Sequence, residues 1–270
     1  MALGRTSFSV VMPSFNQAQY LEAAILSVLD QDGPKVELLV YDGGSTDGSV
    51  DILRKHERRI AYWQSQPDGG QAQAIRDGFA RATGEVLSWL NSDDLLEPGA
   101  LGSVSQAFAA NPQVDIVYGD LLYVEADGRP AFECSVVLDK GILAWLGPSL
   151  NQPSTFWTRT AYQRAGGVDP SFRYAMDLDL IARLMETGAQ AVKLRQRLAR
   201  FRLHPQQKTQ QIHSVGLAEV QRIQARLRGP VANENVEKVR QRLRRFLLDP
   251  RAEWSAHRHR LYLWKSRSGR

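Results

Sequence analysis

Strand-like and helix-like segments alternate between residues 6 and 95, and this alternation restricts the fold more than any other feature of the chain. The predicted strands are Phe8–Met12, Val36–Tyr41, Ile60–Ser65 and Glu85–Leu90. The predicted helices between them are Tyr20–Leu29, Val50–His56 and Gln71–Ala82. Strands that alternate with helices favour a parallel sheet with right-handed crossover connections. We therefore expect an α/β protein.

Three polar segments of this half begin where a predicted strand ends. They are Pro13–Asn16, Asp42–Asp47 and Asn91–Asp94. In open α/β sheets, ligands bind in the crevice beyond the carboxyl ends of the strands. The positions of these segments therefore predict a nucleotide pocket along one edge of the sheet.

The segment Asn91-Ser92-Asp93-Asp94 predicts a metal site. Its carboxylate and amide oxygens are hard ligands of the kind that Mg²⁺ and Mn²⁺ prefer. A cation held there can bridge to a diphosphate and neutralise the charge of a departing nucleoside diphosphate. Alternatively, Asp94 caps the helix expected after Glu97-Pro98. Both interpretations can hold together, with Asp93 on the metal and Asp94 in the turn.

Two glycine-containing loops precede predicted helices and are candidates for donor binding. In the loop from Asp42 to Gly48, free backbone N–H groups can bind an anion and Asp42 can accept a hydrogen bond from a base or ribose. In the loop from Asp68 to Gln71, either end residue can contact ribose or phosphate. The alternative for each loop is an ordinary turn with a helix cap.

Further along the chain, acids and bases occur near a predicted helix and a predicted strand. Asp177 and Asp179 stand at the start of a helix predicted over Leu178–Thr187, where the helix dipole alone also favours acids. As a functional pair, one of them is the general base that deprotonates an acceptor hydroxyl. Arg202, His204 and Lys208 form a basic patch that can bind a diphosphate or complete the metal site.

The amino-acid composition bears on the cellular compartment and the partners of the protein. The single cysteine, Cys134, excludes an internal disulfide and is interpreted as a small buried residue. No secretory signal or membrane-spanning run is recognised, so the expected location is cytoplasmic. The chain carries 34 basic and 29 acidic residues, and the excess gathers from Lys238 to Arg270. This basic tail is interpreted as a solvated helical extension or as a contact with anionic lipid at the inner face of the membrane.

In this order, the motifs resemble those of family 2 glycosyltransferases, which are inverting enzymes with the GT-A fold. The matching segments are Val10–Asn16, Gln31, Glu37–Asp47, Gly84-Glu85, Asn91–Asp94, Gly166–Asp169 and Met176–Leu180. The resemblance covers residues 6 to 210. It implies a Rossmann-like, mostly parallel central sheet flanked by helices, followed by a helical C-terminal extension. The expected domains are residues 1–212, with a nucleotide-sugar half at 6–110 and an acceptor half at 111–212, and an extension at 213–270.

The resemblance also implies roles for individual residues. The residues implied to bind the nucleotide sugar are Pro13, Phe15, Asn16, Asp42, Gly43, Asp68, Gln71, Asn91, Ser92 and Asp93. Asp93 and His204 are the implied metal ligands for Mn²⁺ or Mg²⁺, and Asp177 is the implied base with Asp179 as its rival. Three departures from the family pattern stand out. Gly43 replaces an acid that often contacts the base, and Asn91 replaces the first acid of the D-x-D pattern. Met176 replaces the Glu that often precedes the base, which makes Asp179 a rival to Asp177.

The function expected from these observations is transfer of a sugar from a nucleotide-sugar donor to an acceptor hydroxyl. The expected donor is a UDP-sugar. The enzyme would be hexosyltransferase-like, would act in polysaccharide or glycoconjugate synthesis, and would take a saccharide or lipid-linked acceptor. Trp145, Trp157 and Tyr174 are candidates either for stacking on sugars or for core packing. The alternatives are a nucleotidyltransferase, which would need basic residues in the loop Ser14–Gln17, and a non-catalytic binding module. No recognised motif indicates nucleic-acid binding.

Overall fold

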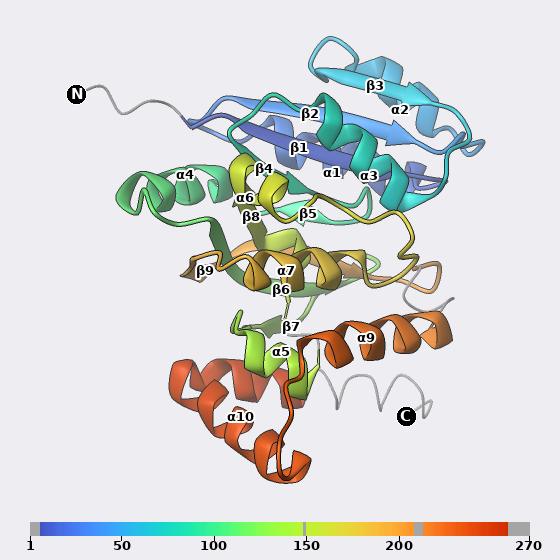
Figure 1. The fold of residues 1–270 in the computed structure, drawn as a ribbon. Helices are drawn as coiled ribbons and strands as arrows, with labels where there is room; N and C mark the ends of the chain where they lie inside the picture. Colours follow the sequence, from blue (N-terminus) through green and yellow to red (C-terminus); the bar gives the residue numbers. More distant parts are fainter. Residues whose placement is uncertain (1–5, 148–149, 208–212, 259–270) are drawn as a thin grey trace.

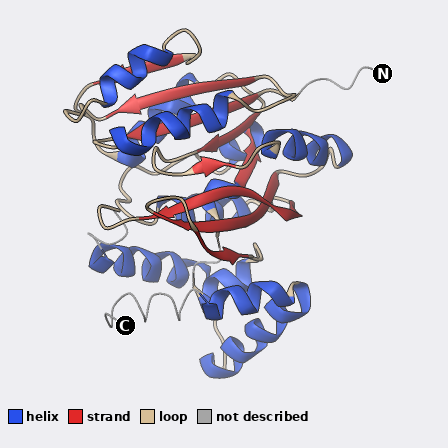
Figure 2. Ribbon diagram, turned by 180° about the vertical axis from the view of Figure 1, so that it is seen from behind, coloured by secondary structure: helices blue, strands red, loops and turns tan. Residues whose placement is uncertain are grey.

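The N-terminal half forms the parallel sheet that the sequence predicts. The computed structural model describes residues 6–147, 150–207 and 213–258. Its first strands are β1 (Phe8–Ser14), β2 (Val36–Asp42), β3 (Tyr62–Ser65) and β4 (Val86–Trp89), paired in parallel in the order β3-β2-β1-β4. Helices α1 (Ala18–Leu29), α2 (Ser49–His56) and α3 (Gln71–Arg81) connect them. Helices lie on both faces of the sheet (Figures 1 and 2).

The second half continues the same sheet with mixed strand directions. Beside β4 lies β8 (Thr155–Thr158), which is antiparallel to β4, followed by β6 (Ile116–Glu125), β9 (Ala191–Leu203) and β5 (Leu95–Leu96). The short strand β7 (Pro130–Cys134) pairs with β6. The expected α/β fold is thus present. The sheet is parallel in the first half of the chain, and the whole sheet is mixed.

Two long strands replace four short ones that the sequence suggested. The predicted segments Asp115–Tyr118, apart from Asp115, and Leu121–Val124 belong to the single strand β6, and Ala191–Leu194 and Leu198–Leu203 belong to β9. The register of β6 on β9 shifts between Tyr118 and Leu121. This irregularity interrupts the alternation of apolar residues while the chain stays in the sheet.

The remaining helices pack around and below this sheet. They are α4 (Ala100–Ala110), α5 (Lys140–Leu146), the 3₁₀ turn η1 (Gln152–Ser154), α6 (Arg159–Arg164), α7 (Met176–Glu186), α9 (His213–Leu227) and α10 (Glu234–Leu248). Both α9 and α10 contact α5, and α10 lies at the end of the molecule away from β3 (Figure 1). Across the described ranges, none of the helices combines the length and the apolar character that crossing a bilayer requires.

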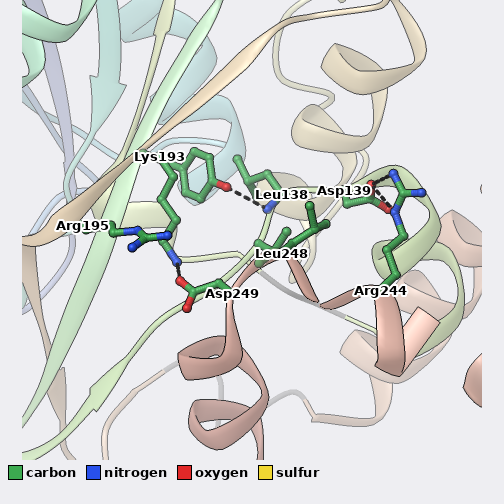
Figure 3. A pocket seen from close by; sticks show the side chains of 9 residues that line it. Leu138, Asp139, Lys193, Arg195, Arg244, Leu248 and Asp249 are labelled. Carbon is green, nitrogen blue, oxygen red and sulfur yellow. Dashed lines mark hydrogen bonds and ion pairs between the residues drawn. The ribbon is translucent and has the colours of Figure 1, made fainter. Parts of the chain in front are cut away.

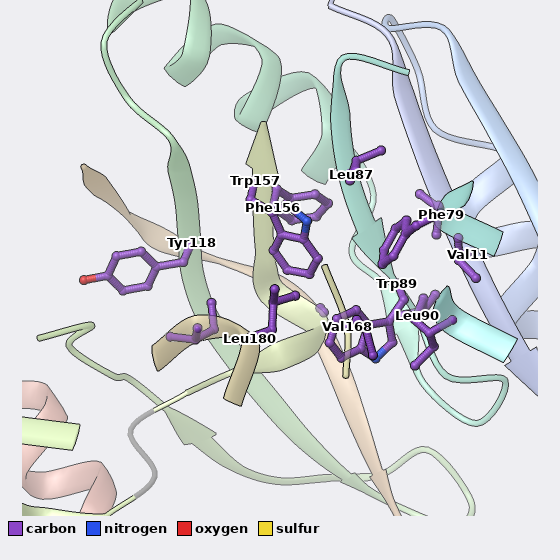
Figure 4. Close-up of a cluster of buried hydrophobic side chains, with 14 of the residues drawn as sticks. Val11, Phe79, Leu87, Trp89, Leu90, Tyr118, Phe156, Trp157, Val168 and Leu180 are labelled. Carbon is purple, nitrogen blue, oxygen red and sulfur yellow. The ribbon is translucent and has the colours of Figure 1, made fainter. Parts of the chain in front are cut away.

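An aromatic cluster anchors β4, the strand that leads into the acidic segment (Figure 4). The rings of Phe79, Trp89 and Trp157 pack edge to face, with centroids 5.4–6.2 Å apart. Such contacts add to the burial of large apolar side chains. Trp157 is buried and Trp145 nearly so, with the Arg228 guanidinium over its ring. The two tryptophans are therefore core residues, which is the second of the two interpretations given for them.

Candidate functional site

The loops after β1 and β2 are joined by Asn16. Its backbone N–H donates to Ser45 Oγ at 2.7 Å, and its side-chain oxygen accepts from the Thr46 N–H at 2.9 Å. Among the described non-glycine residues Asn16 alone has a positive φ, 52°. Asparagine tolerates this left-handed conformation better than most residues do. Asn16 thus fixes the two loops against each other.

Asp42 organises the second loop from the inside. Its side chain is buried, and its Oδ2 accepts from the Ser45 N–H at 2.8 Å and from the Ser65 hydroxyl at 2.6 Å. A third hydrogen bond comes from the Ser45 hydroxyl to Oδ1 at 2.5 Å. With these partners Asp42 holds the loop that borders the expected base pocket, and its carboxylate points into that loop.

Phe15, Gly43 and Asp68 surround one spot at the surface. A Cβ atom added to Gly43 would lie 3.3 Å from a ring carbon of Phe15 and 3.6 Å from both carboxylate oxygens of Asp68. The ring of Phe15 is 61% exposed, which is unusual for a large apolar side chain on a well-packed sheet edge. Pro13, by contrast, is buried within β1. The exposed ring beside a bare glycine backbone offers a flat stacking surface.

The third loop places the acidic segment beside the start of α3. Gln71 Nε2 donates to Asn91 Oδ1 at 2.7 Å, so the helix and the turn after β4 are joined. Ser92 and Asp94 are buried. Asp94 accepts from the Arg202 N–H at 3.0 Å, which ties the turn to the end of β9. Burial and, second, the charge of Asp93 raise the pKa of Asp94 well above its ordinary value.

Asp93 and His204 form the contact at the centre of the site. His204 Nε2 lies 2.9 Å from Asp93 Oδ2, although 111 positions separate them in the chain. The contact exists because β9 pairs with β5, which follows the acidic turn directly. Arg202 Nε donates to the Asp93 carbonyl, and the ring of Tyr20 packs at 5.0 Å from the imidazole. His204 is buried, while the Asp93 carboxylate retains 17% exposure.

These two side chains fit a cation that is shared with a substrate. In the part of the chain that the structure describes, no cluster of three or more His, Cys, Asp or Glu side chains is placed to hold a metal ion. Mg²⁺-type sites often use only one or two protein ligands, completed by water and substrate phosphates. A carboxylate and an imidazole at one loop edge meet that requirement. Lys208 of the predicted basic patch lies outside the described residues.

Asp177 and Asp179 have different environments although they share the first turn of α7. Asp179 is buried and accepts from Arg183 at 2.7 and 2.8 Å and from Arg226 at 2.9 Å. Both of its oxygens are therefore committed to guanidinium groups, and that of Arg226 joins α7 to α9. A general base needs an oxygen directed at the acceptor. In this structure the Asp179 carboxylate is engaged by guanidinium groups, and the choice between Asp177 and Asp179 as base stays a prediction.

Asp177 remains the candidate base, and an unexpected residue positions it. Its carboxylate is partly exposed and accepts from the Leu178 N–H. The Glu219 carboxylate holds the backbone just before Asp177. It accepts hydrogen bonds from three successive N–H groups, those of residues 173 to 175, at 2.8–2.9 Å. Glu219 lies on α9, so sequence reasoning missed it because no local pattern links the two segments. In Figure 1 the chain enters α7 on the side of the molecule where β1 and β2 end.

A family model identifies the protein family of this chain. The model described as glycosyl transferase family 2 matches residues 9–161, which is more than half of the chain. The chain belongs to glycosyl transferase family 2. The matched range contains the loops after β1, β2 and β4, and it ends before α7 and His204.

Relatives of this family member are similar over part of their length. The chain is 34% identical to a glycosyltransferase of Nostoc sp. over 113 residues, 41% of this chain and 35% of the relative. It is 34% identical to the GalNAc(5)-diNAcBac-PP-undecaprenol beta-1,3-glucosyltransferase of Campylobacter jejuni over 135 residues, 47% of this chain and 41% of the relative. In both cases the match spans less than half of the relative.

Solved structures confirm the GT-A fold of this family 2 member. Residues 1–349 of S. aureus TarS in complex with UDP-GlcNAc superpose with a TM-score of 0.65 at 17% identity, covering 87% of this chain and 69% of that one. The mannosyltransferase PcManGT from Pyrobaculum calidifontis, in complex with GDP-Man and Mn²⁺, gives a TM-score of 0.57 at 17% identity, covering 93% and 84%. At these identities the likeness shows the fold alone.

Proposed function

We propose that this family 2 member transfers a hexose-type sugar from a UDP-sugar to an acceptor hydroxyl, with inversion at the anomeric carbon. The observation that carries the proposal is the contact between Asp93 and His204 at the carboxyl edge of the sheet. It sits on the same edge as the Phe15–Gly43–Asp68 surface. One part can hold a diphosphate through a cation and the other can hold a nucleobase.

In the proposed arrangement, Phe15 stacks on the base and Asn16 keeps the two base-side loops together. Gln71 and Asn91, already hydrogen-bonded to each other, face the ribose and diphosphate. Asp93 and His204 would hold Mn²⁺ or Mg²⁺, which when bound stabilises the negative charge of the leaving UDP. The complex of TarS with UDP-GlcNAc supports the choice of a UDP-sugar, and the complex of PcManGT with GDP-Man and Mn²⁺ supports the choice of cation.

The chemical step is assigned to Asp177. Its carboxylate takes the proton of the acceptor hydroxyl, and the acceptor oxygen forms a bond to the anomeric carbon. The bond from that carbon to the UDP oxygen breaks on the opposite face, which inverts the configuration. Glu219 holds the backbone before Asp177 in place through three hydrogen bonds. We propose a saccharide or lipid-linked acceptor, in keeping with the undecaprenol-linked name of the Campylobacter relative.

The two alternative functions lack support from the site. A nucleotidyltransferase would need basic residues in the loop Ser14–Gln17, which has none. A binding module would not require a partly exposed carboxylate beside an imidazole at the sheet edge. Release of UDP from a UDP-sugar, rather than of pyrophosphate, distinguishes glycosyl transfer from nucleotidyl transfer.

The substitution Asp177→Asn tests the proposal. Removing a general base should lower the rate of UDP release from UDP-glucose or UDP-GlcNAc by about 10²–10⁴-fold in the presence of Mn²⁺ and a polyprenyl-diphosphate sugar or oligosaccharide acceptor. The affinity for UDP, measured by titration calorimetry, should remain at the wild-type value. Asp51→Asn, a change of the same type on an 81% exposed side chain of α2, serves as the control. Wild-type turnover in Asp177→Asn would remove the base assignment, and tighter binding of GDP than of UDP would remove the choice of donor.

A further inference from the structure

Helix α10 presents an apolar face to the surroundings. The exposed apolar side chains on it are Val236, Val239, Leu243, Phe246 and Leu247, at 47–73% exposure. At about 100° per residue these positions fall within one arc of roughly 100° on the helix surface. We refer to these five side chains as the α10 apolar face. Large contiguous apolar patches are uncommon on soluble proteins and mark interaction sites.

The opposite face of α10 attaches the helix to the protein through polar groups. Gln241 and Arg245 are buried there, and Arg245 pairs with Glu253 at 2.5–2.7 Å. The Gln241 side chain lies within 3 Å of the position that a Cβ on Gly141 of α5 would take. An amphipathic helix on a globular protein ordinarily does the reverse and buries its apolar stripe.

Two ion pairs at the edge of this attachment secure its orientation (Figure 3). Arg244 pairs with Asp139 at 2.7 Å, and Asp249, just after the helix, pairs with Lys193 of β9 at 2.5 Å. Lys193 also donates to the Val136 carbonyl. Because both ends of the polar face are held by specific partners, the outward direction of the apolar face is built into the fold.

Basic residues border the α10 apolar face. Around the helix, Arg240 lies on one side of this face and Arg242 on the other, and both residues are exposed. Along the helix, five basic residues outnumber the acids Glu234 and Glu237. Lys238 pairs with Glu234 at 3.5 Å and Arg240 with Glu237 at 3.6 Å, while Arg244 and Arg245 have the partners given above. An apolar face flanked by cations is complementary to a surface with an apolar interior and anionic groups at its boundary.

We propose that the α10 apolar face docks on an anionic lipid bilayer, with the helix axis parallel to the membrane plane. A second copy of the chain is the less suitable occupant, because a homotypic pairing of this face would bring the arginines of both copies together. The α10 apolar face lies outside the proposed donor site, and its docking on a bilayer does not depend on that site. Only its use, presentation of a lipid-linked acceptor, rests on the proposed function.

Cosedimentation of the full chain with vesicles tests this proposal. We expect binding to vesicles of phosphatidylcholine and phosphatidylglycerol in equal parts, weakening with salt, and little binding to phosphatidylcholine alone. Leu243→Asn should lower the partition coefficient about tenfold. Leu217→Asn on α9, at 54% exposure against 58% for Leu243, is the matched control and should bind as wild type.

The contribution of charge is tested separately. The double substitution Arg240→Gln/Arg242→Gln should lower partitioning about 25-fold, since each basic residue near an anionic surface contributes roughly fivefold. The matched double substitution Lys35→Gln/Arg58→Gln removes two exposed cations from the N-terminal half and should have little effect. Circular dichroism of each variant verifies folding.

Three results would overturn the proposal. They are absence of wild-type binding to the anionic vesicles, unchanged binding of Leu243→Asn, and a lipid-free dimer by light scattering that Leu243→Asn converts to a monomer. The last result would identify a second copy as the occupant. UDP affinity is measured on the same samples, so a failure of the donor assignment is recognised independently of vesicle binding.

Discussion

At the scale of single residues, burial separates acids that look alike in the sequence. Asp93 keeps a partly exposed carboxylate beside His204, whereas its neighbour Asp94 is buried with a raised pKa. Asp177 is accessible, whereas Asp179 is held by two guanidinium groups. Because a ligand or base must reach its substrate, we propose that the more exposed acid of each pair takes part in the chemistry.

Asp93→Asn is expected to remove the contribution of Mn²⁺ to donor binding. The amide lacks the negative charge that attracts the cation, so UDP affinity in the presence of Mn²⁺ should fall by about 10–100-fold or more, since even outer-shell changes at metal sites cost this much. Titration calorimetry with and without Mn²⁺ measures it, with Asp51→Asn as control. If Mn²⁺ still raises UDP affinity by the wild-type factor, Asp93 is not the ligand.

Phe15→Ala is expected to weaken nucleotide binding without changing stability. Stacking of a base on an aromatic ring contributes about 1–3 kcal/mol, and this ring is 61% exposed and contributes little to the core. The UDP dissociation constant should therefore rise by roughly tenfold or more while the melting temperature stays the same. A variant that melts earlier and binds UDP normally would show that the ring serves packing instead.

At the scale of elements, the donor site depends on how closely α3 packs on β1. Gly78 of α3 faces Val11, which is fully buried, and a Cβ added at Gly78 would lie 2.4 Å from a methyl carbon of that side chain. The close approach sets the depth of α3, and with it the position of Gln71 at the start of the helix. Helix propensity alone would favour alanine at this position.

Gly78→Ala should destabilise the protein by up to about 2 kcal/mol. The strain of overpacking, about 1–3 kcal/mol, exceeds the gain in helix propensity of about 1 kcal/mol. Gly102→Ala in α4 is the matched control, because its nearest neighbour would be an ordinary contact at 3.7 Å, and it should stabilise slightly. Urea denaturation measures both. Equal effects of the two substitutions would contradict the packing argument.

At the scale of the whole molecule, a buried polar network joins the C-terminal helices to the sheet. Asp249 pairs with Lys193, Ser135 donates to Asp120, and Arg251 reaches Asp120 at 3.1 Å. Although burial acts to raise it, the hydrogen bond and charge of Lys193, with Arg251, lower the pKa of Asp249 to about 2. The position of α10, and hence the outward direction of its apolar face, depends on this network.

Asp249→Asn is expected to lower the free energy of unfolding by about 2–3 kcal/mol at neutral pH, because it removes the carboxylate 2.5 Å from Lys193 and leaves only that of Asp120, at 3.5 Å. An ordinary Asp has a pKa of about 3.9, so the stabilisation is complete above about pH 4 and is lost as the pH falls through about 2. The difference between wild type and variant should therefore shrink over that range. Denaturation curves from pH 7 to pH 2 measure it, and a difference independent of pH would argue against an ionised pair.

Local patterns in the sequence were sufficient for the first half of the fold. The predicted strand at Phe8–Met12 and the helix at Gln71–Ala82 appear within two residues of their observed ends. Apolar alternation, helical periodicity and glycine-containing turns are properties of neighbouring residues, so they can be recognised without coordinates. The same patterns placed the polar loops at one sheet edge, because parallel strands end on the same side.

Tertiary structure decided which of the candidate residues meet. The pairing of β9 with β5 and β6 brings His204 to Asp93, and the packing of α9 on α7 commits Asp179 to Arg226 and places Glu219 before Asp177. These partners lie tens of residues apart, and their contact depends on strand register and helix packing that no local pattern specifies. The same reason explains why the outward orientation of α10 is visible only in the folded chain.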